Sequence, residues 1–143
     1  MINSKTYREY INKLSIDLKK WTNTNEYNDT KFAKEITYLP KFLDICLNIY
    51  DNENTSSELR NRAESIINYA ESDFDHLSEA ILGNVGLADD LFLAALFLND
   101  VKDKPIFNFD DETLKKISHI MLISKNMLQI NVYNKCLVTY KKF

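Results

Sequence analysis

The chain has 143 residues, of which 27% are charged and 45% hydrophobic, and its formal net charge is −3 at pH 7. This length fits one domain, residues 1–143, with a hydrophobic core of its own. Two glycines and two prolines leave little of the turn chemistry that sandwiches and barrels need, so we expect a mainly α fold. The predicted architecture is a compact domain of about six helices around a buried central helix.

The first predicted helix runs from Lys5 to Trp21, because apolar residues recur there at spacings of three and four. These residues are Tyr7, Tyr10, Ile11, Leu14, Leu18 and Trp21. Thr6 and Glu9 have the spacing of a capping box at its start. The polar, Asn-rich stretch 22–28 is predicted to be a connection.

Pro40 separates the next two predicted helices, since proline cannot donate to a preceding carbonyl but suits a first helical turn. A short helix precedes it, with one of residues 28–30 as its N-cap. The following helix ends at Tyr50, before a polar break. Thr55 stands three residues before a glutamate, which predicts a second capping box. The helix that it opens ends within residues 69–72.

The central stretch, residues 75–101, organises the rest of the chain. Two glycines allow a sharp turn, and Asp89 and Asp90 then fall in the first turn of a new helix, where carboxylates are favourable. Residues 91–98 are apolar on every side of a helical wheel, which predicts a helix of about 87–100 that is buried all round. The run is too short to cross a bilayer.

The C-terminal third begins with a predicted loop, residues 102–109. Asp110 or Asp111 is then expected to cap a helix. The last stretch, residues 126–143, fits two structures equally well. Its apolar residues follow a helical stripe, while alternating apolar and polar residues around an Asn-Lys pair are typical of a β-hairpin.

No pattern in the sequence indicates catalysis, so we expect that the protein is not an enzyme and needs no cofactor. Cys46 and Cys136 lie in apolar surroundings without CxxC spacing, and the N-terminus has no signal-peptide pattern, so we expect reduced thiols and a cytoplasmic location. His76 and His119 have no metal-binding spacing. Neighbouring acidic residues could hold a hard cation, but helix capping and pairing with arginines explain them better, so no metal site is predicted.

Charge is distributed unevenly along the chain. Residues 63–100 contain eight acidic residues and no Lys or Arg, whereas residues 1–62 carry 10 basic and 9 acidic residues and residues 101–143 carry 8 basic and 4 acidic. An acidic surface favours a basic partner and disfavours nucleic acid. The simpler interpretation is a solvated rim around the central helix.

A motif within residues 39–100 resembles the YkvA-like family of small helical bacterial domains of unknown function. The positions that carry this resemblance are Arg60, Tyr69, Asp75, Glu79, Gly83, Gly86, Leu87, Asp89 and Asp90. Two prolines of the family pattern are replaced here by Asp73 and Ser78. The resemblance implies a helical fold, and membrane association for some members.

These observations predict a non-catalytic protein-binding module, for example an immunity or antitoxin-type protein that occludes a basic partner such as a nuclease toxin. The residues predicted to face the partner are Asp73, Asp75, Glu79, Asp89 and Asp90. The alternative is a membrane-proximal or divalent-metal-responsive accessory protein. Nucleic-acid binding ranks third, because the pI is acidic. A homodimer that buries one side of the central helix also agrees with the sequence.

Overall fold

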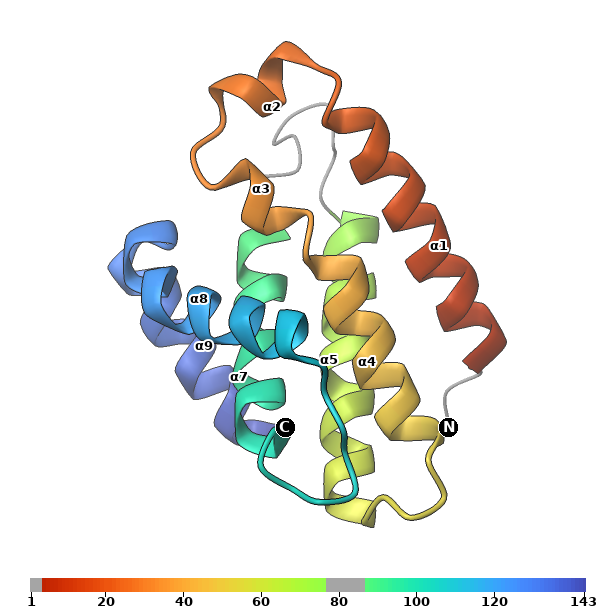
Figure 1. Ribbon diagram of the computed structural model, residues 1–143. Coiled ribbons are helices and arrows are strands. Elements are labelled where there is room, and N and C mark those ends of the chain that lie inside the picture. The colour runs from red at the N-terminus through yellow and green to blue at the C-terminus, as the bar shows by residue number, and fades with distance from the viewer. Residues whose placement is uncertain (1–3, 77–86) are drawn as a thin grey trace.

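The computed structural model describes residues 4–76 and 87–143, with the side chains of 72–76 left out. The regular elements in these ranges are all helices (Figure 1), which confirms the mainly α prediction. They are α1 (Ser4–Trp21), α2 (Asn25–Asp29), α3 (Ala33–Ile36), α4 (Leu39–Asp51), α5 (Ser57–His76), α7 (Ala88–Val101), α8 (Asp111–Met127) and α9 (Ile130–Lys142).

Helix α7 is the centre of the core, as its composition predicts. It contacts α4, α5, α8 and α9, and in Figure 1 it lies between α5 on one side and α8 and α9 on the other. Of residues 91–98, only Leu96 is half-buried and the others are buried. Asp89 and Asp90 stand in its first turn. In the ranges described above, no helix is long and apolar enough to cross a membrane.

Helix α1 packs on α4, and all six residues of its predicted apolar stripe are buried. The capping box at its start was wrong, because Thr6 and Glu9 lie inside a helix that already includes Ser4. The predicted connection 22–28 also contains α2, whose N-cap Thr24 accepts a hydrogen bond from the backbone N–H of Tyr27 at 3.3 Å. A short polar helix was missed there because it buries no residue.

Helix α3 is shorter than predicted, and its N-cap is Phe32, with φ 63° in the left-handed region. Residues 28–30 do not cap it because they end α2. Pro40 lies in the first turn of α4, as predicted. The second capping box was wrong: the buried Thr55 hydroxyl donates to the carbonyl of Ile49 at 2.7 Å, while the Ser56 hydroxyl accepts from the helix that follows.

The C-terminal segment is a helix, α9, so the hairpin alternative was wrong. Its buried residues are Cys136 and Tyr140, and the ring of Tyr133 stacks on Phe92 of α7 at 5.0 Å. Asp110 caps α8, as expected, by accepting from the backbone N–H of Thr113 at 2.7 Å.

Candidate functional site

The five acidic residues predicted to face a partner do not form one described surface. Asp73 and Asp75 belong to α5, but their side chains lie outside the described residues, as does all of Glu79. Asp89 is half-buried, and its Oδ2 accepts a hydrogen bond from the hydroxyl of Tyr69 at 3.3 Å. Asp90 is only 1% exposed, which does not fit a residue that contacts a partner.

The positions of Asp89 and Asp90 follow from helix geometry. Consecutive residues on a helix point in different directions, and here the second of the two faces the core. A carboxylate in a first turn is favoured by the partial positive charge of the helix N-terminus. The position of Asp90 in the first turn of α7 therefore accounts for its burial, and the predicted acidic surface loses one residue.

Two further carboxylates of the acidic stretch lie beside α1. Glu64 and Glu71 are half-buried on α5, and the hydroxyl of Tyr7 donates to Asn68 on the same helix face. The pKa of Tyr7 is raised to about 12, first by burial and then by Glu71 and Glu64. Burial and these two carboxylates therefore both favour the neutral phenol at this contact between α1 and α5.

A cluster that the sequence did not predict joins α5, α7 and α9. The hydroxyl of Tyr140 donates to Asp100 Oδ2 and accepts from Arg62 Nη1 at 3.4 Å. The Arg62 guanidinium also lies 5.0 Å from the centre of the Tyr140 ring. Burial, then the bond to Asp100, raises the pKa of Tyr140. These contacts fasten the C-terminal helix, and no short motif links residues so far apart in the sequence.

Among the side chains that the structure describes, residues 4–71 and 87–143, no group of three or more His, Cys, Asp or Glu could hold a metal ion. Cys46 and Cys136 are buried and are not joined in a disulfide, and burial raises the pKa of the Cys46 thiol. His119 Nε2 lies 3.7 Å from Glu35 Oε2 at the surface.

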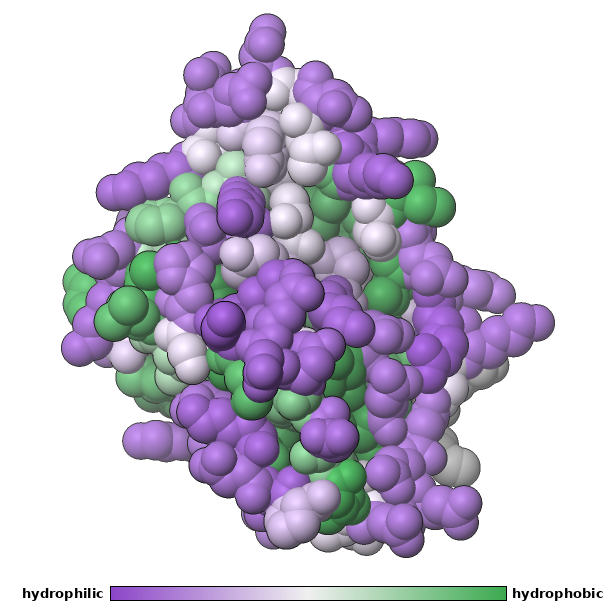
Figure 2. Space-filling model, viewed as in Figure 1, coloured by the Kyte–Doolittle hydropathy of each residue, from purple (hydrophilic) through white to green (hydrophobic). Residues whose placement is uncertain are grey.

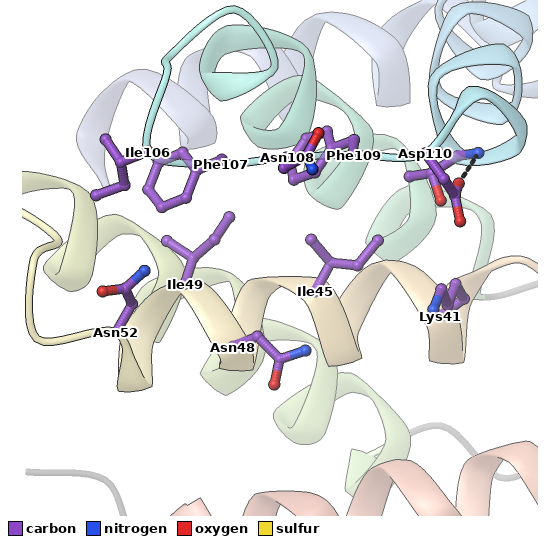
Figure 3. A pocket seen from close by; sticks show the side chains of 11 residues that line it. Lys41, Ile45, Asn48, Ile49, Asn52, Ile106, Phe107, Asn108, Phe109 and Asp110 are labelled. Atoms are coloured by element: carbon purple, nitrogen blue, oxygen red, sulfur yellow. Dashed lines mark hydrogen bonds between the residues drawn. The ribbon is translucent and has the colours of Figure 1, made fainter.

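A groove of about 310 Å³ lies between α4 and the loop before α8. It is lined by Lys41, Ile45, Asn48, Ile49, Asn52, Ile106, Phe107, Asn108, Phe109, Asp110 and Thr113. In Figure 3, residues 106–110 run alongside α4, and Ile45 and Ile49 point from α4 toward them. We call this the α4 groove.

Both walls of the α4 groove are held in place. On one wall, the backbone N–H of Phe107 donates to the carbonyl of Lys104 at 3.1 Å, closing a turn with Pro105 at the position where proline is favoured. Phe107 is 8% exposed and anchors the loop in the core. On the other wall, Asn48 Oδ1 accepts from Arg8 Nη2 at 2.9 Å. The groove is thus pre-formed.

A second surface feature covers α8 and α9. Residues 113–143 contain six lysines and no Asp or Glu. Leu122, Ile130 and Val138 are 80%, 65% and 53% exposed, and Figure 2 shows apolar surface on the side where Figure 1 places these helices. We call this combination of exposed apolar and basic residues the α8–α9 surface.

Comparison with known proteins adds nothing to this description: no family model, no curated protein and no solved structure matches the chain. Sequence reasoning indicated the basic charge of residues 101–143 but missed the exposed apolar residues of the α8–α9 surface. It also missed the groove, which joins segments more than fifty residues apart.

Proposed function

We propose that the protein is a non-catalytic protein-binding module that covers a basic surface of its partner. The observation that carries this proposal is the acidic stretch, residues 63–100, with eight acidic residues and no basic one. Its described residues belong to α5 and α7, and Glu71 and Glu64 of this stretch add to the rise in the pKa of Tyr7 that burial causes first.

The mechanism would be steric and electrostatic occlusion. A surface of one charge sign accelerates encounter with a partner of the opposite sign and rejects partners of the same sign. Helical periodicity places positions 64, 71 and 75 of α5 along one stripe. An immunity or antitoxin-type protein would use such a stripe to cover the Lys and Arg of a nuclease toxin. The positions 60–90 that resemble the motif of YkvA-like domains overlap this region, and membership of that family is part of the proposal.

The test is capture of partners from a lysate of the source organism on the tagged full chain, at low and at high salt. A stoichiometric basic partner that salt releases is expected. The double variant Glu64→Lys with Glu71→Lys should then weaken binding by about tenfold or more, because like charges would meet. The matched control is Glu53→Lys with Asp103→Lys, which makes the same charge change at exposed residues outside the acidic stretch. Equal binding by both double variants would refute the proposal.

The α8–α9 surface favours a second candidate function, association with an anionic membrane surface. Each lysine near such a surface contributes about 1 kcal/mol, and exposed apolar residues such as Leu122 can enter the headgroup region. Co-sedimentation with vesicles containing phosphatidylserine should fall in Leu122→Asn and not in Ile16→Asn, since Ile16 is exposed on α1. If the accessory protein instead responds to divalent metals, its melting temperature should rise with Mg²⁺, Mn²⁺ or Ca²⁺. No vesicle binding and no metal response would remove this candidate.

A further inference from the structure

The two walls of the α4 groove, residues 106–110 and α4, run alongside each other (Figure 3). Figure 3 shows the order Ile106 to Asp110 on one wall facing the order Asn52 to Lys41 on the other. Ile45 and Ile49, one helical turn apart on α4, form an apolar floor between them. Such a shape fits an extended chain better than a compact ring.

One wall offers unpaired backbone groups. Residues 107–110 have no regular secondary structure. Within the part of the chain that the structure describes, the backbone N–H and C=O groups of Asn108 and Phe109 form no backbone hydrogen bond. Backbone polar groups of an extended segment are a template for a second extended chain, which gains affinity from main-chain hydrogen bonds.

The other wall offers side-chain amide donors. Asn48 and Asn52 already use their Oδ1 atoms, which accept from Arg8 and from the backbone N–H of Asn54, each at 2.9 Å. Their amide N–H groups remain as donors. Residues four apart on a helix are separated by about 6 Å along the axis, close to the spacing of about 6.7 Å between alternate residues of an extended chain. Carbonyls on one edge of an extended peptide therefore match both asparagines.

The charges in the groove indicate an uncharged occupant. Lys41 and Asp110 stand at one end (Figure 3), and each offsets the other. The other polar lining residues, three asparagines and Thr113, are uncharged. A charged side chain over Ile45 and Ile49 would lose its hydration without gaining a partner of opposite sign.

We propose that the α4 groove binds an extended, uncharged segment of a partner protein, pairing with the backbone of Asn108 and Phe109 on one edge and with Asn48 and Asn52 on the other. Branched apolar side chains of the segment would pack on Ile45 and Ile49. This proposal does not depend on the acidic stretch, and the two can fail separately.

The experiment is a titration of the ¹⁵N-labelled full chain with the capped peptide acetyl-Ser-Val-Leu-Val-Ser-amide, followed by NMR. We expect saturable shifts at Ile45, Ile49 and residues 106–109, with a Kd of about 1 mM or below. A peptide of the same side chains with its three central amides N-methylated should bind about tenfold more weakly, since it cannot pair with the loop. A peptide with Asp in place of its central Leu should not bind.

Variants of the chain provide a second test. Asn52→Asp keeps the oxygen that Asn54 uses but removes the N–H donors, and it should weaken binding about tenfold. Ile45→Lys should abolish binding, whereas Ile16→Lys, a matched change at an exposed isoleucine of α1, should not. Glu71→Lys should leave peptide binding unchanged.

Three outcomes would overturn the proposal. They are the absence of saturable shifts up to about 5 mM peptide, shifts outside the groove, and equal binding of the N-methylated peptide. The last would identify the groove as a site for apolar groups that does not recognise peptide backbone. Because this control changes the ligand, it stays decisive even where a variant of the chain does not fold.

Discussion

Replacing Tyr140 with Phe removes one hydroxyl and leaves the ring that lies 5.0 Å from the Arg62 guanidinium. The change breaks the bond to Asp100 and the longer one from Arg62. A hydrogen bond to a charged group contributes about 1.5–3 kcal/mol, and the lower end applies here because Asp100 is exposed and water can replace the hydroxyl. We expect a loss of about 1.5 kcal/mol, or about 5 °C in melting temperature. Urea and thermal unfolding followed by circular dichroism measure both quantities.

A double-mutant cycle tests whether the loss belongs to the Tyr140–Asp100 contact. Tyr140→Phe and Asp100→Ala remove the same bond, so their combined effect should be smaller than the sum of the two single effects. Additivity within about 0.3 kcal/mol would refute the reasoning, and so would a Tyr140→Phe variant as stable as the original. Tyr140→Leu, which also removes the ring, should cost more than Tyr140→Phe.

Three further predictions concern pH and packing. Burial and nearby carboxylates raise the pKa of Tyr7 to about 12. The stability due to its neutral phenol is therefore complete below about pH 10 and is lost as the pH rises toward about 12. The melting temperature should fall over this range, and it should fall less in Tyr7→Phe. The hydrogen bonds from Thr113 lower the pKa of Asp110 below 3.8. The stability that the Asp110 carboxylate contributes is therefore present above that pH and is lost on further acidification. Asp110→Ala should lower the melting temperature at pH 7 and make it less sensitive to acid. Phe92 is fully buried, and Phe92→Ala should cost about 3–5 kcal/mol in urea unfolding.

The elements that hydrophobic periodicity alone determines were predicted well. Helix α1 carries one apolar face, and the same six residues that form it in the sequence are buried in the fold. Helix α7 is apolar all round between residues 91 and 98, and it packs against four other helices, α4, α5, α8 and α9. Burial of apolar area is the dominant favourable term in folding, so a long and unambiguous pattern decides both the type of element and the side that faces the core.

The C-terminal segment could not be decided in this way, because its residues fit the helical period and the strand period together. Long-range contacts select the helix: Tyr133 stacks on Phe92, and Tyr140 bonds to Asp100. These contacts require the helical spacing of seven residues to bring both rings to the same side. The sequence contains the two tyrosines but not the location of their partners on α7.

The candidate sites also contain features that the sequence predicts and features that only the packing of the helices determines. The sequence indicates that Asp89 and Asp90 start a helix and point apart, but only the packing of α7 determines that Asp90 faces inward. The two capping boxes failed for a similar reason. A Thr-x-x-Glu spacing occurs inside helices as well as at their starts, and the hydroxyl of Thr55 finds a better partner in the carbonyl of Ile49.

The acidic stretch provides most of α5 and nearly all of α7, whereas the lysines after Glu112 belong to α8 and α9. The apolar middle of α7, residues 91–98, contributes no charge, and α7 contacts α5, α8 and α9. Added salt would weaken both the binding of a basic protein and the binding of an anionic membrane, so salt dependence alone does not distinguish the two proposed functions. Charge reversal distinguishes them. Glu71→Lys should weaken only the binding of the basic partner, and Lys135→Glu, at an exposed residue of α9, should weaken only the binding to the membrane.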